Sequence, residues 1–305
     1  MLRYFIKRLL QTIPLIIIVS FAIFMLIRVI PGDPARLMAG LDATYEEVER
    51  IRVMHGLDDP LVVQYGRFIR NTLNGDLGIS LRTGRPVSDM LFPRYPVTFS
   101  LAVTSMGWAL IIGLTIGIVS AVFRGKWPDY MGMLFAVVGI SIPTFWLGLM
   151  LMQWFSVGLR WFPVTGLGSA RAYVLPSLTL GAGIMAMVAR NARSEMVEVM
   201  RQDYIRTARA KGLREPEVVL KHALKNSMVQ VTTVIGLQFA FLLGGTVITE
   251  RVFGIAGLGG LLVESIFFRD YTVIQAQLII FAFVFIIINI IVDMIYGLLN
   301  PKIRY

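Results

Sequence analysis

Residues 272–299 read TVIQAQLIIFAFVFIIINIIVDMIYGLL, and Asp293 is the one charged side chain among them. A helix needs about 20 mostly apolar residues to cross the hydrocarbon layer of a bilayer. Within that layer every backbone N–H and C=O group must find a partner inside the protein, and a helix meets that demand along its own length. Residues 272–299 are therefore predicted to form a membrane-spanning helix, which determines the class of the fold.

Stretches of the same kind recur along the chain, and they predict an all-α integral membrane protein with about six membrane-spanning helices. The predicted spans are residues 9–30, 98–122, 131–157, 174–190, 229–249 and 272–299. The composition agrees, because 56% of the 305 residues are hydrophobic and only 16% are charged. A soluble globular domain of this size is not expected to be so apolar.

The predicted spans divide the chain into four parts. Residues 1–30 form an N-terminal anchor helix, 31–97 an extracytoplasmic cap, 98–299 a membrane core with a cytoplasmic loop at 191–228, and 300–305 a cytoplasmic tail. The cap keeps apolar residues at periodic positions, among them Tyr65 and Phe68, which predicts folded structure rather than disorder. The first span is expected to remain as an anchor, because residues 30–34 (IPGDP) do not resemble a signal-peptide cleavage site.

The distribution of Lys and Arg predicts the orientation. If the N-terminus is cytoplasmic, the inside segments include nine basic residues from Arg190 to Lys225. The short outside loops then hold only Arg160, Arg171, Arg251 and Arg269. Because basic residues concentrate in short cytoplasmic loops, both termini are expected in the cytoplasm. The same scattering argues against nucleic acid as a partner, since it leaves no continuous basic face.

The cytoplasmic loop contains a segment that reads DYIRTARAKG from Asp203 to Gly212. Asp203 is a predicted N-cap, Gly212 a predicted helix end, and Pro216 suits the first turn of a following helix. These signals predict two short helices that project as a basic knob (residues 203–217), with the small residues Ala208 and Ala210 suited to a groove in a partner protein. A solvated basic loop near anionic headgroups is the alternative, and periodicity does not separate the two.

Several kinds of chemistry are not expected of this chain. A nucleotide-binding Gly-x-x-x-x-Gly-Lys-Ser/Thr motif is absent, since Gly125-Lys126 is followed by Trp127. There are no cysteines, and the two histidines, His55 and His222, are too few and too separated for a metal site. The chain is therefore expected not to be an enzyme and to hold no cofactor of its own.

The acidic residues associated with the spans, Glu250 and Asp293, lie near predicted span ends. A helix-end or interfacial role is predicted for both, which disfavours an ion-coupled carrier, because such carriers place ionisable groups deep in their spans. The glycines within residues 254–260 predict tight turns in an outside loop. Gly113 and Gly117 form a small-x-x-x-small face that lets helices approach closely.

The knob resembles the loop by which permeases of bacterial ATP-binding-cassette (ABC) importers engage their ATPases, the EAA loop. The first three positions of that pattern fall on Arg206, Thr207 and Ala208, and its glycine is Gly212. Its later Ile-x-Leu-Pro part falls on His222, Leu224 and Lys225, where the proline is missing. This variant is usual in the dipeptide and oligopeptide branch of the family.

Other segments resemble the same branch, and together they cover nearly the whole chain. They are IPGDP (30–34), GLDDPL (56–61), GDLG (75–78), YVLPSL (173–178), GLG (257–259), RDY (269–271) and NPKIRY (300–305). Within the branch, the chain is most similar to the first permease of dipeptide and glutathione importers.

The resemblance implies a type I ABC importer permease fold in the bacterial inner membrane, with an extracytoplasmic loop domain after the first helix. It implies import of small peptides: a dipeptide, an oligopeptide or glutathione. The implied partners are a second homologous permease, two cytoplasmic subunits that bind ATP and Mg, an extracytoplasmic peptide-binding protein and membrane lipid. Nickel chelates or opines are alternative cargoes in the same family. An ATP-independent channel or carrier, or a membrane sensor or assembly factor, is the alternative outside it.

The resemblance also implies roles for particular residues. The expected ATPase-coupling residues are Tyr204, Arg206, Thr207, Ala208, Gly212 and Glu217. The expected docking residues for the binding protein are Asp33, Asp58 and Asp59. Among the coupling residues, Ala208 is expected to provide the close fit and Gly212 the turn.

Overall fold

The computed structural model describes residues 2–29, 33–40, 43–54, 56–166 and 168–299. These residues are helical with connecting turns, and no strand occurs among them, which confirms the all-α prediction. Ile79 and Pro86 form an isolated bridge. The predicted tail at 300–305, His55 and the side chain of Asp293 lie outside the described part of the chain.

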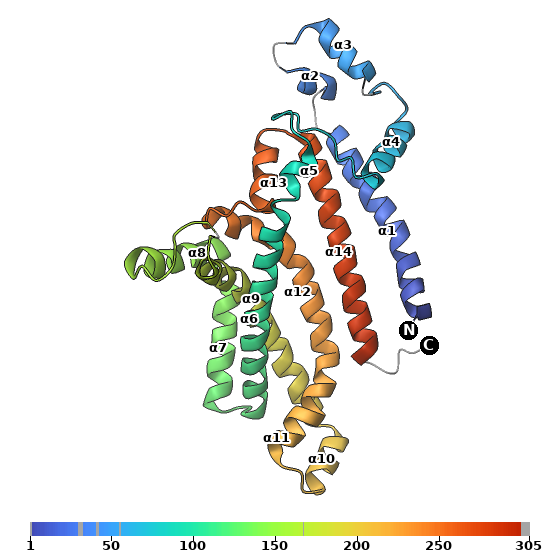
Figure 1. Ribbon diagram of the computed structural model, residues 1–305. Coiled ribbons are helices and arrows are strands. Elements are labelled where there is room, and N and C mark those ends of the chain that lie inside the picture. The colour runs from blue at the N-terminus through green and yellow to red at the C-terminus, as the bar shows by residue number, and fades with distance from the viewer. Residues whose placement is uncertain (1, 30–32, 41–42, 55, 167, 300–305) are drawn as a thin grey trace. The chain divides into compact units, whose positions relative to one another are not determined.

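Each of the six predicted spans is helical over most of its described residues (Figure 1). In chain order the elements are α1 (Leu2–Val29), α2 (Pro34–Ala39), α3 (Tyr45–Met54), α4 (Leu61–Leu73), α5 (Val87–Leu91), α6 (Tyr95–Val122), α7 (Trp127–Ser141), α8 (Thr144–Leu151), the π-helix η1 (Met152–Gly158), the 3-10 turn η2 (Ala170–Tyr173), α9 (Val174–Val199), α10 (Asp203–Ala210), α11 (Glu215–Glu217), the π-helix η3 (Val218–Ala223), α12 (Leu224–Val252), α13 (Leu258–Phe267) and α14 (Tyr271–Leu299).

Length and hydropathy alone qualify fewer helices as spans. Among the described residues, three stretches are long and apolar enough to cross a membrane: Val87–Val122, Ala170–Val199 and Tyr271–Val292. The pair Trp127–Ser141 and Thr144–Gly158 adds a fourth if it is counted as one span. The apolar stretch Leu10–Met25 of α1 is shorter.

The predicted single span at 131–157 is wrong in one respect, because it is broken. The two halves meet at a bend of 103°. Ile142 has an extended backbone (φ −79°, ψ 124°), and Pro143 precedes the first residue of α8. A proline lacks the N–H that the helix would use and keeps the preceding residue out of the helical region, so the sequence around Pro143 forces the break.

The chain divides into two compact units, which are described separately. The first contains Pro96–Gly260 with the described residues of 1–8 and 285–305, and the second contains Leu9–Tyr95 with Leu261–Val284.

In the first unit α6 and α9 approach each other closely through glycine. A Cβ added to Gly113 would lie 2.7 Å from the carbonyl oxygen of Met185, and one added to Gly117 would lie 2.7 Å from the Cβ of Ala192. A larger residue at either position would push the helices apart. The small-residue face predicted for α6 is therefore confirmed as a packing surface.

In the second unit the cap is folded against α1. Tyr65 on α4 lies with its ring centroid 5.2 Å from that of Phe21 and 5.3 Å from that of Phe24. Ser20 and Tyr65 share a hydrogen bond of 2.7 Å between their hydroxyl oxygens. Large aromatic groups bury much area at such contacts, which is why the periodic apolar residues of the cap order it.

Candidate functional site

The knob is built from α10, α11 and the turn between them, and it protrudes beyond the ends of α6 and α7 (Figure 1). Gly212 follows α10 with φ at +80°, and its N–H donates to the carbonyl oxygen of Arg209 at 2.9 Å. This left-handed glycine is a usual helix end, so the prediction for Gly212 is confirmed. Pro216 lies in the first turn of α11, as predicted. The predicted cap is wrong by one residue, because Gln202 is the N-cap and Asp203 is the first helical residue.

The inner face of the knob packs against its own chain. Ile205 and Ala208, three positions apart on α10, are buried in an apolar cluster with Ala121 at the end of α6 and Met196 on α9. Ala208 is only 6% exposed and packs against its own chain, so its close fit to a partner stays a prediction that this inward packing does not favour. Residues three apart lie on one face of a helix, and the spacing of Ile205 and Ala208 between polar and charged residues was the signal for this inner face.

The outer face of the knob carries most of the other expected coupling residues. Tyr204, Arg206, Thr207 and Gly212 are exposed. The side chain of Arg206 is 78% exposed and has one weak ion pair, 3.8 Å from Asp203. A partner could reach this face, so the structure brings these four residues together on an accessible surface.

Ion pairs brace the turn of the knob. Arg209 donates to both carboxylate oxygens of Glu215, at 3.0 and 2.6 Å, across the turn that contains Gly212. This hydrogen bonding holds the pKa of the Glu215 carboxyl below its ordinary value. Glu217, an expected coupling residue, accepts a hydrogen bond from Lys221 at 2.5 Å, which likewise lowers its pKa. Glu217 therefore serves the chain's own structure as well as being partly accessible.

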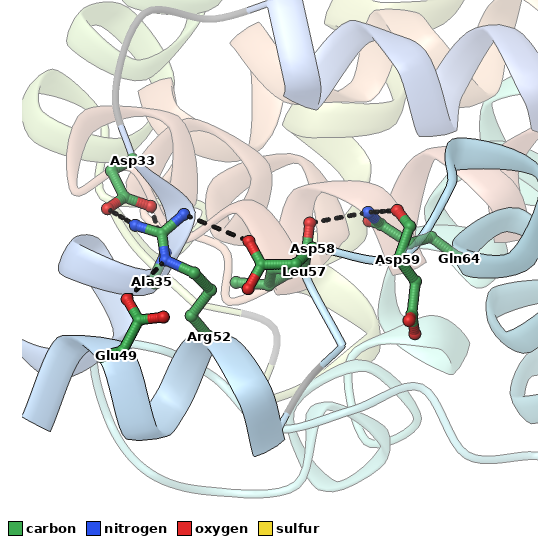
Figure 2. Close-up of polar contacts among 8 residues, drawn as sticks. All are labelled: Asp33, Ala35, Glu49, Arg52, Leu57, Asp58, Asp59 and Gln64. Carbon is green, nitrogen blue, oxygen red and sulfur yellow. Dashed lines mark hydrogen bonds and ion pairs between the residues drawn. The ribbon is translucent and has the colours of Figure 1, made fainter.

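Arg52 forms ion pairs with two of the three expected docking acids, Asp33 and Asp58 (Figure 2). Its guanidinium lies 2.6 Å from Asp33, 3.2 Å from Glu49 and 3.8 Å from Asp58. Asp33 is also the N-cap of α2, because its carboxylate accepts from the backbone N–H of Ala35 at 3.0 Å. Asp58 has the longest of these contacts and a side chain that is 60% exposed. Of the acids around Arg52, Asp58 is the one best placed to meet another molecule.

The third expected docking acid, Asp59, has separate partners. Its carboxylate accepts from Arg67 at 2.5 Å. Its backbone carbonyl oxygen and that of Leu57 both accept from the side-chain amide of Gln64, at 2.8 and 2.9 Å (Figure 2). These bonds fix the turn between α3 and α4, so Asp59 is held in place by the cap itself.

Glu250 is a residue whose surroundings the sequence did not predict. It lies near the end of α12, as expected for a helix-end role, and it is fully buried within the protein. The hydroxyl of Thr98 donates to its carboxylate at 2.6 Å, and the backbone N–H of Gly260 donates at 3.0 Å. A Cβ at Gly257 would collide with this carboxylate, so the glycine-rich segment is shaped to enclose it. The signal was an acid followed within ten residues by several glycines.

The described part of the chain holds no group of three or more His, Cys, Asp or Glu side chains placed to bind a metal ion. The knob carries an exposed basic and aromatic face, and the cap carries partly paired carboxylates.

Two protein families match this sequence. The binding-protein-dependent transport system inner membrane component matches residues 113–305, and the N-terminal part of such a membrane component matches residues 1–102. Among curated proteins, the chain is 52% identical to the "Glutathione transport system permease protein GsiC" of Pectobacterium atrosepticum and 50% identical to that of Escherichia coli K12. Each alignment spans 305 residues and covers 100% of both chains.

Solved structures show a similar fold. The inward-facing MetNI methionine ABC transporter aligns with a TM-score of 0.59 at 20% identity, covering 69% of this chain and 96% of that one. An amino acid ABC transporter aligns with a TM-score of 0.51 at 15% identity, covering 71% and 95%. At such identities the likeness concerns the fold alone.

Proposed function

Because the chain belongs to the family of binding-protein-dependent transport system inner membrane components, we propose that the solute it helps to import is glutathione or a related small peptide. The chain is a multi-pass membrane permease subunit of a bacterial ABC importer. One observation carries the substrate proposal: identity of 50–52% to glutathione permeases continues over the entire chain, cap included.

The proposed complex contains a second homologous permease, two separate subunits that bind ATP and Mg, and an extracytoplasmic binding protein. Both termini and the knob then lie in the cytoplasm of the cell, in accord with the nine basic residues from Arg190 to Lys225. The absence of a nucleotide-binding motif in this sequence supports a division of labour in which the partner subunits hydrolyse ATP.

The proposed mechanism is alternating access. Closure of the ATP-binding subunits pushes on the outer face of the knob, at Tyr204, Arg206 and Thr207. Ala208 contributes from the inside, because it joins the knob to α6 and α9 through the shared apolar cluster. A knob joined in this way passes force to the spans rather than deforming, and the spans rearrange around a pathway shared with the second permease.

Uptake by the reconstituted complex tests the proposed function. The complex with its binding protein in proteoliposomes should accumulate labelled glutathione when ATP is supplied, and excess unlabelled glutathione or a short peptide should abolish the signal. A catalytically dead ATP-binding subunit should reduce uptake to the background. Uptake that survives in that control would mean a channel or carrier, assembly without any flux would mean a sensor, and competition by a nickel chelate alone would move the substrate to that class.

Asp58→Lys tests the proposed docking surface. Asp58 is exposed and only loosely paired, so its reversal should leave the cap folded, whereas Asp33 caps α2. We expect the binding protein to associate at least about threefold more slowly at low salt, with a smaller difference at high salt, because charges at an interface rim act mainly on the association rate. Stopped-flow or surface-based binding kinetics measures this, with Glu46→Lys on the exposed side of α3 as the matched control. Equal effects of both reversals would remove Asp58 from the docking surface.

A further inference from the structure

An ion pair between a buried carboxylate and a partly buried arginine lies beside the base of the knob, and it is separate from the expected coupling residues. Asp129, in the first turn of α7, is only 3% exposed. Its two carboxylate oxygens accept from the Nε and Nη2 atoms of Arg193 on α9, at 2.5 and 2.7 Å. One of them also accepts from the backbone N–H of Gly125 in the turn between α6 and α7, at 2.9 Å. One carboxylate thus ties that turn to α9.

The packing around the pair is made of small residues. A Cβ added to Gly117 would lie 2.7 Å from the Cβ of Ala192, and 3.2 Å from the backbone nitrogen of Arg193. A Cβ at Gly132 on α7 would collide with the hydroxyl of Ser120 on α6. Small, smooth surfaces of this kind let helices approach closely, but apolar contact has little directional preference.

The ion pair fixes the relative orientation of these helices, which the packing of small residues does not fix. A guanidinium and a carboxylate that share two parallel hydrogen bonds are fixed in both distance and angle. Ion pairs add little net stability whether they are exposed or buried, so stability is a poor explanation for this partly buried one. Its geometric effect is specific, since it sets how α7 and the α6–α7 turn are rotated relative to α9.

The ion pair lies close to the apolar cluster that holds the knob. Arg193 lies on α9 shortly before Met196, which belongs to the apolar cluster that also contains Ala121 of α6 and Ile205 and Ala208 of α10. The knob is therefore attached to α6 by apolar contact and, through α9, to α7 by the ion pair.

We propose that Asp129 and Arg193 are positioning residues that lock the α6–α7 turn to α9 at the base of the knob, so that the knob and these helix ends move as one rigid body during transport. This inference rests on the proposed function, because it describes how a push on the knob reaches two further helices. Neither residue belongs to the outer face of the knob that carries Tyr204, Arg206, Thr207 and Gly212.

Distance measurements between spin labels test the proposal. The chain has no cysteine, so Lys126→Cys and Leu220→Cys, both exposed, place one label at the α6–α7 turn and one on η3 next to the knob. In the assembled complex, with partner cysteines replaced, the distance distribution between these labels should be narrow and the same with and without ATP. Adding Arg193→Ala should broaden the distance distribution, because the Asp129 carboxylate loses both hydrogen bonds from the guanidinium. It should also reduce the solute transported per ATP hydrolysed to at most about a tenth of the wild-type value.

Matched variants separate this role from a general loss of folding. Arg190→Ala removes an exposed arginine from the same helix and should leave both readouts unchanged. Asp129→Asn can keep the hydrogen bond from the Gly125 N–H while it weakens the paired hydrogen bonds with Arg193. It should therefore broaden the distance distribution in a complex that still assembles. A narrow distribution with normal transport per ATP in both Arg193→Ala and Asp129→Asn would overturn the proposal. The distance readout needs no transported solute, so a wild-type complex without uptake would remove the proposed function and leave the rigid-body result to be judged by itself.

Discussion

Gly212→Trp should leave the membrane helices folded and reduce solute transported per ATP by at least about tenfold, because it places a large side chain where we expect a tightly fitting partner. Nothing lies within 4 Å of a Cβ added at Gly212, so the chain itself has room for the new side chain. The positive φ makes any side chain there unfavourable by about 1–2 kcal/mol, which the ion pair between Arg209 and Glu215 across the turn helps to withstand. The loss should therefore appear in coupling and not in the amount of folded chain.

Two controls isolate the contact from the backbone strain. Asn adopts the left-handed conformation more readily than most residues and is small, so Gly212→Asn should transport nearly normally. Gly75→Trp in the cap meets the same conditions, with φ at +82° and nothing within 4 Å, and it should also couple normally. Uptake and ATP hydrolysis measured on equal amounts of assembled complex decide the matter. A fully coupled Gly212→Trp complex would mean that no partner closes on this turn.

The sequence predicted the helix end at Gly212 and the first helical turn at Pro216, but it did not predict that Ala208 points inward, and these outcomes have the same origin. Helix ends follow from local chemistry, because glycine and proline restrict or free their own backbone wherever they stand. The direction in which Ala208 points depends on α6 and α9, which lie far away in sequence and supply Ala121 and Met196. A small residue suits close contact with a partner and close contact with its own chain equally well, so residue type alone could not choose between them.

The break in the third span could have been predicted from local sequence. Pro143 follows Ile142 in the middle of a long apolar run. A proline inside a helix removes a backbone hydrogen bond and keeps the preceding residue out of the helical region. Hydropathy averages over such a run and does not register one residue, so the span was drawn as continuous. Asp129 and Arg193 are a different case, because their pairing joins α7 to α9 across many residues and leaves no trace in local periodicity.

Glu250 shows most clearly what a single sequence cannot supply. Its place near a helix end was correctly predicted, and an acid near the end of a membrane helix usually reaches water and needs no special partner. The structure instead surrounds it with Thr98 from α6 and the first turn of α13, which no spacing rule connects. The glycines at 257 and 259 were interpreted as turn formers, whereas their lack of a side chain makes room for the carboxylate and for Val247.

Glu250→Ala is expected to be the most destabilising of the substitutions considered. It removes the acceptor of the Thr98 hydroxyl, which is buried, and of the Gly260 backbone N–H, which is partly buried. An orphaned buried donor costs about 1–3 kcal/mol, so the Thr98 hydroxyl alone accounts for that much, and the Gly260 N–H and the empty volume add to it. The folded chain should be recovered in much lower yield, and its melting midpoint in detergent, followed by size-exclusion fluorescence, should fall.

Graded variants show whether the carboxylate or only its volume matters. Glu250→Gln keeps the shape and one acceptor but turns an amide N–H₂ toward a donor, so its midpoint should lie between those of wild type and Glu250→Ala. Thr98→Val should lose part of the same stability, and the double variant with Glu250→Gln should lose less than the two single losses combined, by at least about 0.5 kcal/mol, because the residues share one network. Glu198→Ala, an exposed acid on α9, is the control. If Glu250→Ala has the same melting midpoint as Glu198→Ala, the carboxylate does not organise the segment between α12 and α13. The glycines there must then be explained by the backbone alone.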